Sequence, residues 1–126
     1  MIVKALSLKQ PWAELVVSGK KKIELRKWNT HFRGEFMIHA SKISDINAMK
    51  RFGFNNLPCG AIIGKAKLID VKHYEDEKEL SLDANLHLAN NEWGSFGFLL
   101  GEVERLDKPI VAKGSLNFWN YENGKI

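Results

Sequence analysis

Residues 19–42 hold most of the side chains in this sequence that could carry out binding chemistry. The segment has seven basic and two acidic residues, a local charge of +5, whereas the whole chain carries +4 and the remainder therefore sums to −1. Trp28 and Phe32 lie between these charges. Cationic groups that hold phosphates, beside rings on which bases stack, are what a single-stranded nucleic acid site requires. A solvated, charged strand and turn is the alternative interpretation.

Three charged residues of this segment are the strongest candidates for ligand contacts. Arg26 can grip a phosphate or a base edge with two parallel hydrogen bonds, while Lys21 acts as a point charge. Residues 22–28 alternate in polarity, which places Glu24 and Arg26 on one face of a strand. Glu24 could orient the two cations or accept a hydrogen bond from a base amino group. A simple ion pair between Glu24 and Arg26 is the competing interpretation.

Two further residues of the segment have two interpretations each. Trp28 is either a platform on which a base stacks or a plug of the hydrophobic core. Arg33 precedes Gly34 in a loop, where it could hold a nucleic acid backbone or be an ordinary exposed arginine.

Length and composition indicate which other classes of protein the chain can belong to. A chain of 126 residues is one ordinary domain, which we assign to 1–126. The four histidines and Cys59 show no metal-ligand spacing and there is no Gly-rich phosphate loop, so we predict neither a metal nor a cofactor. No apolar run approaches the ~20 residues of a membrane span. With one cysteine and no signal peptide, we expect a cytoplasmic protein that does not bind membranes.

Apolar and alternating runs predict short strands at residues 2–8, 22–28, 34–40, 60–72, 96–106 and 116–119. Gly64 lies inside the longest of them, where a glycine can mark a bend or bulge. A turn-rich connection through Pro109 is expected over 106–114. Curved strands of this kind, with short helices between them, predict an α+β fold with a small bent barrel and helices packed on its outside.

The predicted helices are three and brief. Pro11 suits the start of the first, Trp12, Leu15 and Val16 form its inward face, and Gly19 can end it. The second is capped by Ser41 or Ser44 and runs to about residue 51, and its expected inward residues are Ile43, Ile46 and Met49. The third is expected over 80–89, on an acidic surface that disfavours nucleic acid.

The spacing Gly19-x-Lys21-x-x-Glu24-x-Arg26 resembles the GxKxxExR signature of ASCH domains, which are relatives of the PUA fold. The resemblance covers most of the chain and is strongest over residues 6–42, where a Gln-Pro-Trp turn and an Arg-Gly pair flank the signature. Trp93 and the segment LDKPIVAKGSLNFW are compatible with it.

This resemblance implies a PUA-like β-barrel flanked by short helices, with a cleft lined by the signature residues. It also implies a nucleic acid partner, in the first place RNA, in RNA processing or transcription coregulation. Lys42 and Lys113 are then secondary phosphate contacts by their place in the family arrangement. Protein partners of the acidic surface over 75–92 are a further alternative.

Some compact members of the family are enzymes, and one group is similar to acetylcytidine amidohydrolase, which uses a Lys, a Thr and a Glu. Lys21 is retained here, whereas Glu24 stands where the threonine would be, and Thr30 lies outside the signature. This departure counts against amidohydrolase chemistry. Lys21 and Glu24 are nevertheless the candidate catalytic residues of a small hydrolase acting on modified nucleosides, the alternative function.

Overall fold

The computed structural model describes residues 1–89 and 94–122. Trp93 lies outside these residues. In chain order the described elements are β1 (Ile2–Leu8), α1 (Trp12–Val17), β2 (Ile23–Arg26), β3 (Gly34–Ala40), α2 (Ile46–Phe52), β4 (Ala61–His73), α3 (Glu77–Leu82), α4 (Ala84–His87), β5 (Phe96–Val111) and β6 (Phe118–Glu122). The first, third and fourth predicted strands thus match closely, and the α+β class is confirmed.

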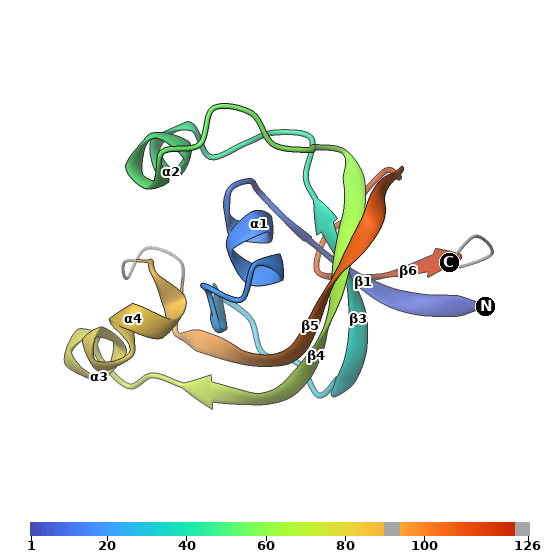
Figure 1. The fold of residues 1–126 in the computed structure, drawn as a ribbon. Coiled ribbons are helices and arrows are strands. Elements are labelled where there is room, and N and C mark those ends of the chain that lie inside the picture. Colours follow the sequence, from blue (N-terminus) through green and yellow to red (C-terminus); the bar gives the residue numbers. More distant parts are fainter. Residues whose placement is uncertain (90–93, 123–126) are drawn as a thin grey trace.

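The strands form one mixed sheet in the order β2-β5-β4-β3-β1-β6. Only β1 and β3 pair in parallel, and the other neighbours are antiparallel. The long strands β4 and β5 bend around α1, which gives the sheet its barrel-like curve (Figure 1). The barrel does not close through backbone pairing, because the edge strands β2 and β6 are not neighbours in the described sheet.

Helix α1 lies inside this curve and forms the centre of the hydrophobic core (Figure 1). Trp12, Leu15 and Val16 are buried as predicted, and Gly19 adopts φ +81° just after the helix. The expectation that the helices pack on the outside of the barrel is therefore wrong for α1. Its sequence explains the position, since Ala13 and Val17 are buried too and a helix that is apolar nearly all round must be covered on all sides.

Gly64 lies at an irregularity of the sheet, as predicted. The pairing of β4 with β5 shifts register between Ile62 and Gly64. A Cβ atom at residue 64 would lie 2.6 Å from the carbonyl oxygen of Glu104 and 2.9 Å from a Val17 methyl carbon. The absence of a side chain therefore lets both strands approach α1 at the point where they bend.

Helix α2 differs from the predicted helix in its N-cap residue and in the face that it buries. Its N-cap is Asp45, whose carboxylate accepts a hydrogen bond from the backbone N–H of Ala48 at 3.1 Å, rather than a serine. Ile43 and Ile46 are 72% and 63% exposed, so the predicted inward face is wrong. The physical reason is that Asp45 also accepts from the indole N–H of Trp12 at 3.0 Å, and this bond sets how the helix meets α1.

In the second half of the chain, the observed elements differ from the predicted ones mainly in their boundaries. Strand β5 continues to Val111, where a turn-rich connection was expected. Pairing with β4 jumps from Ile62↔Ile110 to Gly64↔Arg105, and Pro109 lies within this shift, where its missing N–H is tolerated. The helix expected over 80–89 is two short helices, α3 and α4, and β6 begins two residues later than predicted.

Candidate nucleic-acid interface

A cleft of about 520 Å³ lies where the barrel is left open, between the carboxyl ends of β1 and β2. Its volume is within the range of about 300–1,000 Å³ typical of small-ligand sites. The lining comes from the ends of these two strands, from α1 and the turn after it, from the turn before β6, and from the residues that follow β3 and α4: Ser7, Lys9, Trp12, Lys21, Glu24, Leu25, Arg26, Lys27, Trp28, Ser41, Ala89, Ser115, Leu116 and Asn117. Four of the predicted contact residues therefore lie together in this cleft: Lys21, Glu24, Arg26 and Trp28.

Glu24 lies between the two cations of the signature on the cleft floor. One carboxylate oxygen is 3.6 Å from Lys21 Nζ and the other is 3.0 Å from Arg26 Nη2. Strand β2 places Glu24 and Arg26 on one face, as the alternation predicts, while the turn after α1 brings in Lys21. The sequence alone left the position of this ammonium group open.

Lys21 is buried, with only 2% of its surface exposed. Its ammonium donates to the carbonyl oxygen of His87 and lies 4.9 Å from the ring centroid of Trp12. Burial lowers the pKa of Lys21, and the neighbouring Glu24 carboxylate opposes this effect. With these partners Lys21 is placed to orient Glu24.

Arg26 is only partly bonded by the protein. Its Nη2 donates to the carbonyl oxygen of Ser7 at 2.9 Å, which links β2 to β1 across the open side of the barrel. The same nitrogen faces Glu24, and Nε is buried without a hydrogen-bond partner among the described residues. Because the described part of the protein bonds the guanidinium only through Nη2, N–H groups of the guanidinium remain that can donate to a ligand in the cleft.

Trp28 lies at the margin of the core and also at the cleft. Its ring packs edge-on against Phe98 and Phe118, with centroids 5.2 and 5.9 Å away, so it belongs to the margin of the core. It is only half-buried, and it lines the cleft. A ring held in this way is pre-oriented for contact with an aromatic ligand.

The other predicted contacts lie outside the cleft. Arg33 is exposed, 3.2 Å from Asp70, and it also donates to carbonyl oxygens of its own loop. Lys42 and Lys113 are exposed and are not among the lining residues. Sequence reasoning missed Lys9 and Lys27, which do line it. Lys27 lies in the basic segment, but only the tertiary structure reveals that Lys9, at the end of β1, faces the same cleft.

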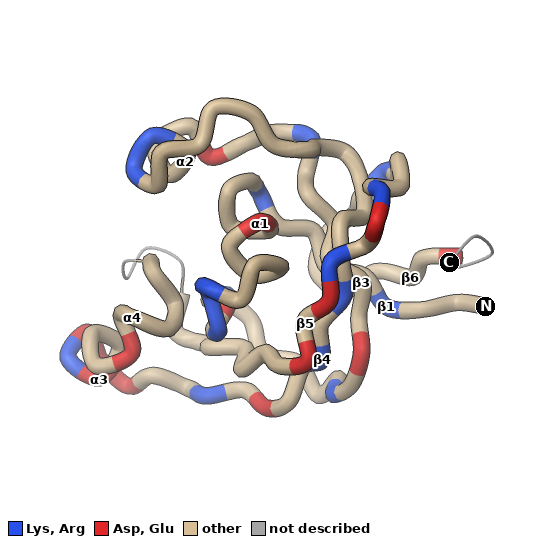
Figure 2. Tube along the Cα trace, viewed as in Figure 1, with Lys and Arg blue, Asp and Glu red and all other residues tan. Residues whose placement is uncertain are grey.

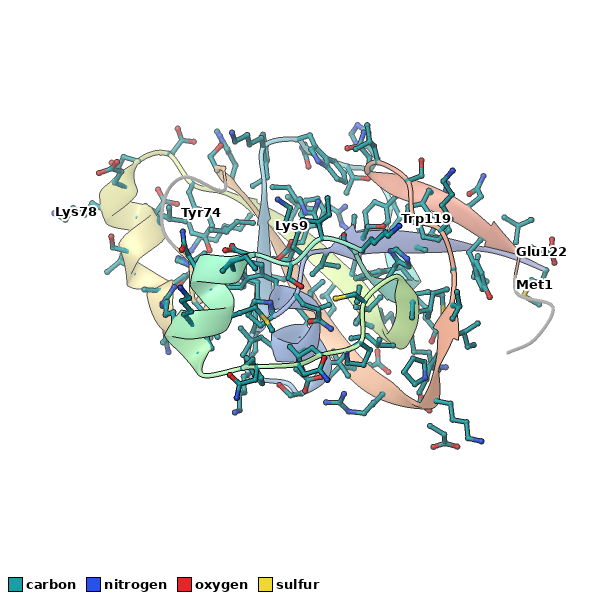
Figure 3. All side chains as sticks on the ribbon, turned by 90° about the horizontal axis from the view of Figure 1, so that it is seen from above. Met1, Lys9, Tyr74, Lys78, Trp119 and Glu122 are labelled. Carbon is teal, nitrogen blue, oxygen red and sulfur yellow. The ribbon has the colours of Figure 1, made fainter. Side chains whose placement is uncertain are left out.

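Lys and Arg residues gather around α1, on α2 and on the segment leading into β2, while β4 and β5 carry mixed charges (Figure 2). Several of these mixed charges pair with one another, as in Lys65 with Glu35 and Glu104. Lys9 lies centrally between the Tyr74 end and the Glu122 end of the molecule (Figure 3). Lys9 and Lys27, both exposed, add positive charge at the cleft itself.

Across residues 1–89 and 94–122, His, Cys, Asp and Glu form no group of three or more that could hold a metal ion. No helix in this described part has the length and apolar character needed to cross a membrane.

Comparison with known proteins agrees with this fold. The chain is 28% identical over 132 residues to activating signal cointegrator 1 of Mus musculus and, equally, to that of Homo sapiens, covering 94% of this chain and 22% of each relative. It thus spans about a fifth of the length of these curated relatives. The solved structure of ASCH from Zymomonas mobilis has a TM-score of 0.61 at 20% identity, over 85% of this chain and 71% of that one. A variant of that protein gives 0.62, covering 73% of its chain.

Residues 6–115 match the sequence profile of the ASCH domain. This match covers most of the chain and includes the complete signature around the cleft, and the fold agrees with that of a solved ASCH protein. The chain belongs to the ASCH domain family.

Proposed function

We propose that this domain binds single-stranded nucleic acid, RNA in the first place, in the cleft between β1 and β2. The observation that carries the proposal is the composition of the cleft: exposed Lys9 and Lys27, the half-buried ring of Trp28, and the Glu24–Arg26 pair on the floor. A positively charged path beside aromatic rings is how proteins hold a single strand. A duplex is instead read by an element that enters a groove, and α1 is buried.

Family membership supports RNA as the ligand, because ASCH domains are generally taken to bind nucleic acid. The name of the relatives, activating signal cointegrator 1, motivates the finer proposal of a role in transcription coregulation or RNA processing. Lys42, next to the lining residue Ser41, is a proposed phosphate contact for a strand that continues beyond the cleft. Arg33 and Lys113 are proposed in the same outer role.

The test is a fluorescence titration of labelled single-stranded RNA at several salt concentrations. For single strands, each neutralised phosphate contributes roughly 0.7 to the slope of log affinity against log salt. The double variant Lys9→Ala/Lys27→Ala should therefore bind more weakly and lower this slope by about 1.4. Lys78→Ala/Lys108→Ala removes the same charge from exposed positions outside the cleft and is the matched control.

Absence of binding by the unmodified chain at low salt would overturn the proposed function. Equal weakening by the two double variants would place the contacts on the general surface instead of in the cleft, and would overturn the site. A larger effect of the cleft variant, with the smaller slope, supports both.

One observation favours hydrolysis of a modified nucleoside as a second candidate. A buried lysine with a lowered pKa beside a carboxylate is the environment in which amines act as bases or nucleophiles. Chromatography of acetylcytidine after incubation with the protein tests this function directly. Turnover that is lost in Lys21→Ala would establish it; unchanged substrate would exclude this substrate.

A further inference from the structure

We propose that the cleft takes one nucleotide base-first and that Leu116 is the apolar contact on the inserted base. This inference rests on the proposed function, which by itself says only that a strand binds. It adds which part of the nucleotide enters, which part stays outside, and a contact residue that lies far from the signature in sequence.

The floor of the cleft is poorly suited to a phosphate. The Glu24 carboxylate lies between Lys21 and Arg26 and neutralises one of their two positive charges. Lys21 is buried and its ammonium already donates to the carbonyl oxygen of His87, so a phosphate at the floor would meet the Glu24 carboxylate instead of a free cation. A base carries no net charge, and its edge offers both donors and acceptors to a carboxylate and to the partly bonded guanidinium of Arg26. Phosphates then remain outside, where Lys9 and Lys27 are exposed.

Leu116 is 86% exposed, yet it lines this cleft. A single exposed leucine on a protein surface needs no explanation. At the edge of a cleft that also contains Trp12, Leu25 and Trp28, it extends the apolar part of the lining into solvent, where contact with water is unfavourable. A flat base that enters beside it would remove its side chain from water.

The turn that carries Leu116 is fixed on its N-terminal side. The backbone of Gly114 lies against a pair formed by Ser7 and His39, where an added Cβ would come within 2.6 Å of both side chains. His39 Nε2 donates to the carbonyl oxygen of Ala112 at 2.7 Å, so its Nδ1 accepts from the Ser7 hydroxyl at 2.9 Å. Trp119 Nε1 donates to the same hydroxyl at 3.0 Å.

The turn is fixed on its C-terminal side as well. Asn117 has φ +56°, a conformation that asparagine tolerates better than most residues. Phe118 then enters the core, where its ring centroid lies 5.4 Å from Phe36, 5.9 Å from Trp28 and 6.1 Å from Phe98. The backbone on both sides of Leu116 is therefore fixed by contacts with the fold, so the exposed side chain has a defined position at the cleft.

The experiment compares Leu116→Ser with Leu82→Ser, which makes the same change at a 76% exposed leucine on α3 outside the cleft. Both side chains are exposed, so both variants should fold. Affinity for a short single-stranded RNA is measured at several salt concentrations, together with the emission of a 2-aminopurine placed at one position of the strand. The same titrations use a strand of equal length whose bases are removed.

Leu116→Ser is expected to weaken binding to the complete strand about fivefold, because the apolar contact with the inserted base is lost. The salt slope should not change, since no phosphate contact is lost. On the strand without bases, Leu116→Ser and the unmodified chain should bind equally. Leu82→Ser should match the unmodified chain throughout, and the 2-aminopurine emission change should be smaller in Leu116→Ser.

If the unmodified chain binds RNA with the expected salt slope but Leu116→Ser matches Leu82→Ser, base insertion is wrong and the proposed function stands. If the unmodified chain binds no RNA, both fall together. Equal loss on the strand with and without bases would assign Leu116 to the backbone and overturn the proposal. Self-association that disappears in Leu116→Ser, measured by sedimentation, would assign Leu116 to contact with a second copy and also overturn it.

Discussion

Glu24 lies between the two cations of the cleft floor and forms an ion pair with each of them. We expect Glu24→Gln to lower the free energy of unfolding by about 3 kcal/mol, because it leaves the buried Lys21 ammonium without its counter-charge. RNA affinity should fall as well, and it should depend on Arg26. Glu24→Gln, Arg26→Ala and the double variant measured in urea and by titration should be strongly non-additive. Additive effects, with tighter binding in Glu24→Gln, would mean that Glu24 is only a surface charge.

Lys21 should affect how the free energy of unfolding depends on pH. Its pKa is lower in the folded chain than the ordinary 10.5, so the unfolded chain binds more protons in the interval between the two values. Stability is therefore reduced by this group at lower pH and recovers as pH rises toward 10.5. Relative to Lys21→Met, the unmodified chain should therefore gain free energy of unfolding, measured in urea, as pH rises toward 10.5. A constant difference over this interval would contradict the buried charge.

At the scale of elements, the helices α3 and α4 are tied to the end of β4 by a single polar cluster. The buried Tyr74 hydroxyl donates to Asp83 at 2.6 Å, and Lys72 donates to the same carboxylate oxygen at 3.0 Å. The Tyr74 bond, helped by Lys72, holds the pKa of Asp83 below its usual range. Burial, followed by the Asp83 bond, raises the pKa of Tyr74. These groups stabilise the fold over the neutral range and lose their effect in acid and in strong alkali.

Tyr74→Phe should therefore lower the free energy of unfolding by about 1.5–3 kcal/mol at neutral pH, the usual contribution of a hydrogen bond to a charged group. The sign for Asp83 follows from its lowered pKa: its contribution is present above the unfolded value near 3.8 and is lost as pH falls. The variant should accordingly show a shallower fall of stability in acid. Tyr121→Phe is the control, because the Tyr121 hydroxyl makes no hydrogen bond among the described residues. Equal curves of unfolding free energy against pH for the two variants would contradict the role of the cluster.

At the scale of the whole molecule, side chains rather than backbone pairing hold the open side of the barrel together. Arg26 bonds to Ser7 across it, and Phe118 from β6 stacks on Phe98 from β5 with ring planes 5° apart. Phe118→Ala should cost about 2–3 kcal/mol, since the ring is partly buried. Hydrogen exchange should accelerate first in β6 and β2, while β4 amides stay protected. Uniform acceleration across the sheet would mean that the barrel opens only as a unit.

The sequence by itself determined the elements that depend on local pattern. Alternation and apolar runs located β1, the signature strand and β3, and Gly64 marked the bend of β4. The spacing of the signature predicted that Glu24 and Arg26 would share one face of the strand, because residues two apart lie on the same side. These features follow from the period of a strand or a helix, which neighbouring residues reveal without the rest of the fold.

Tertiary structure decided everything that depends on contacts between distant segments. Pattern placed Ile43 and Ile46 inward, but the bond from Trp12 to Asp45 turns α2 so that both are exposed. A charge count could not tell that Arg33 faces Asp70 while Lys9 faces the cleft. The cleft itself exists because β2 and β6 do not pair, and such a gap depends on strand order. Strand order depends on how the whole chain buries α1, which no local pattern encodes.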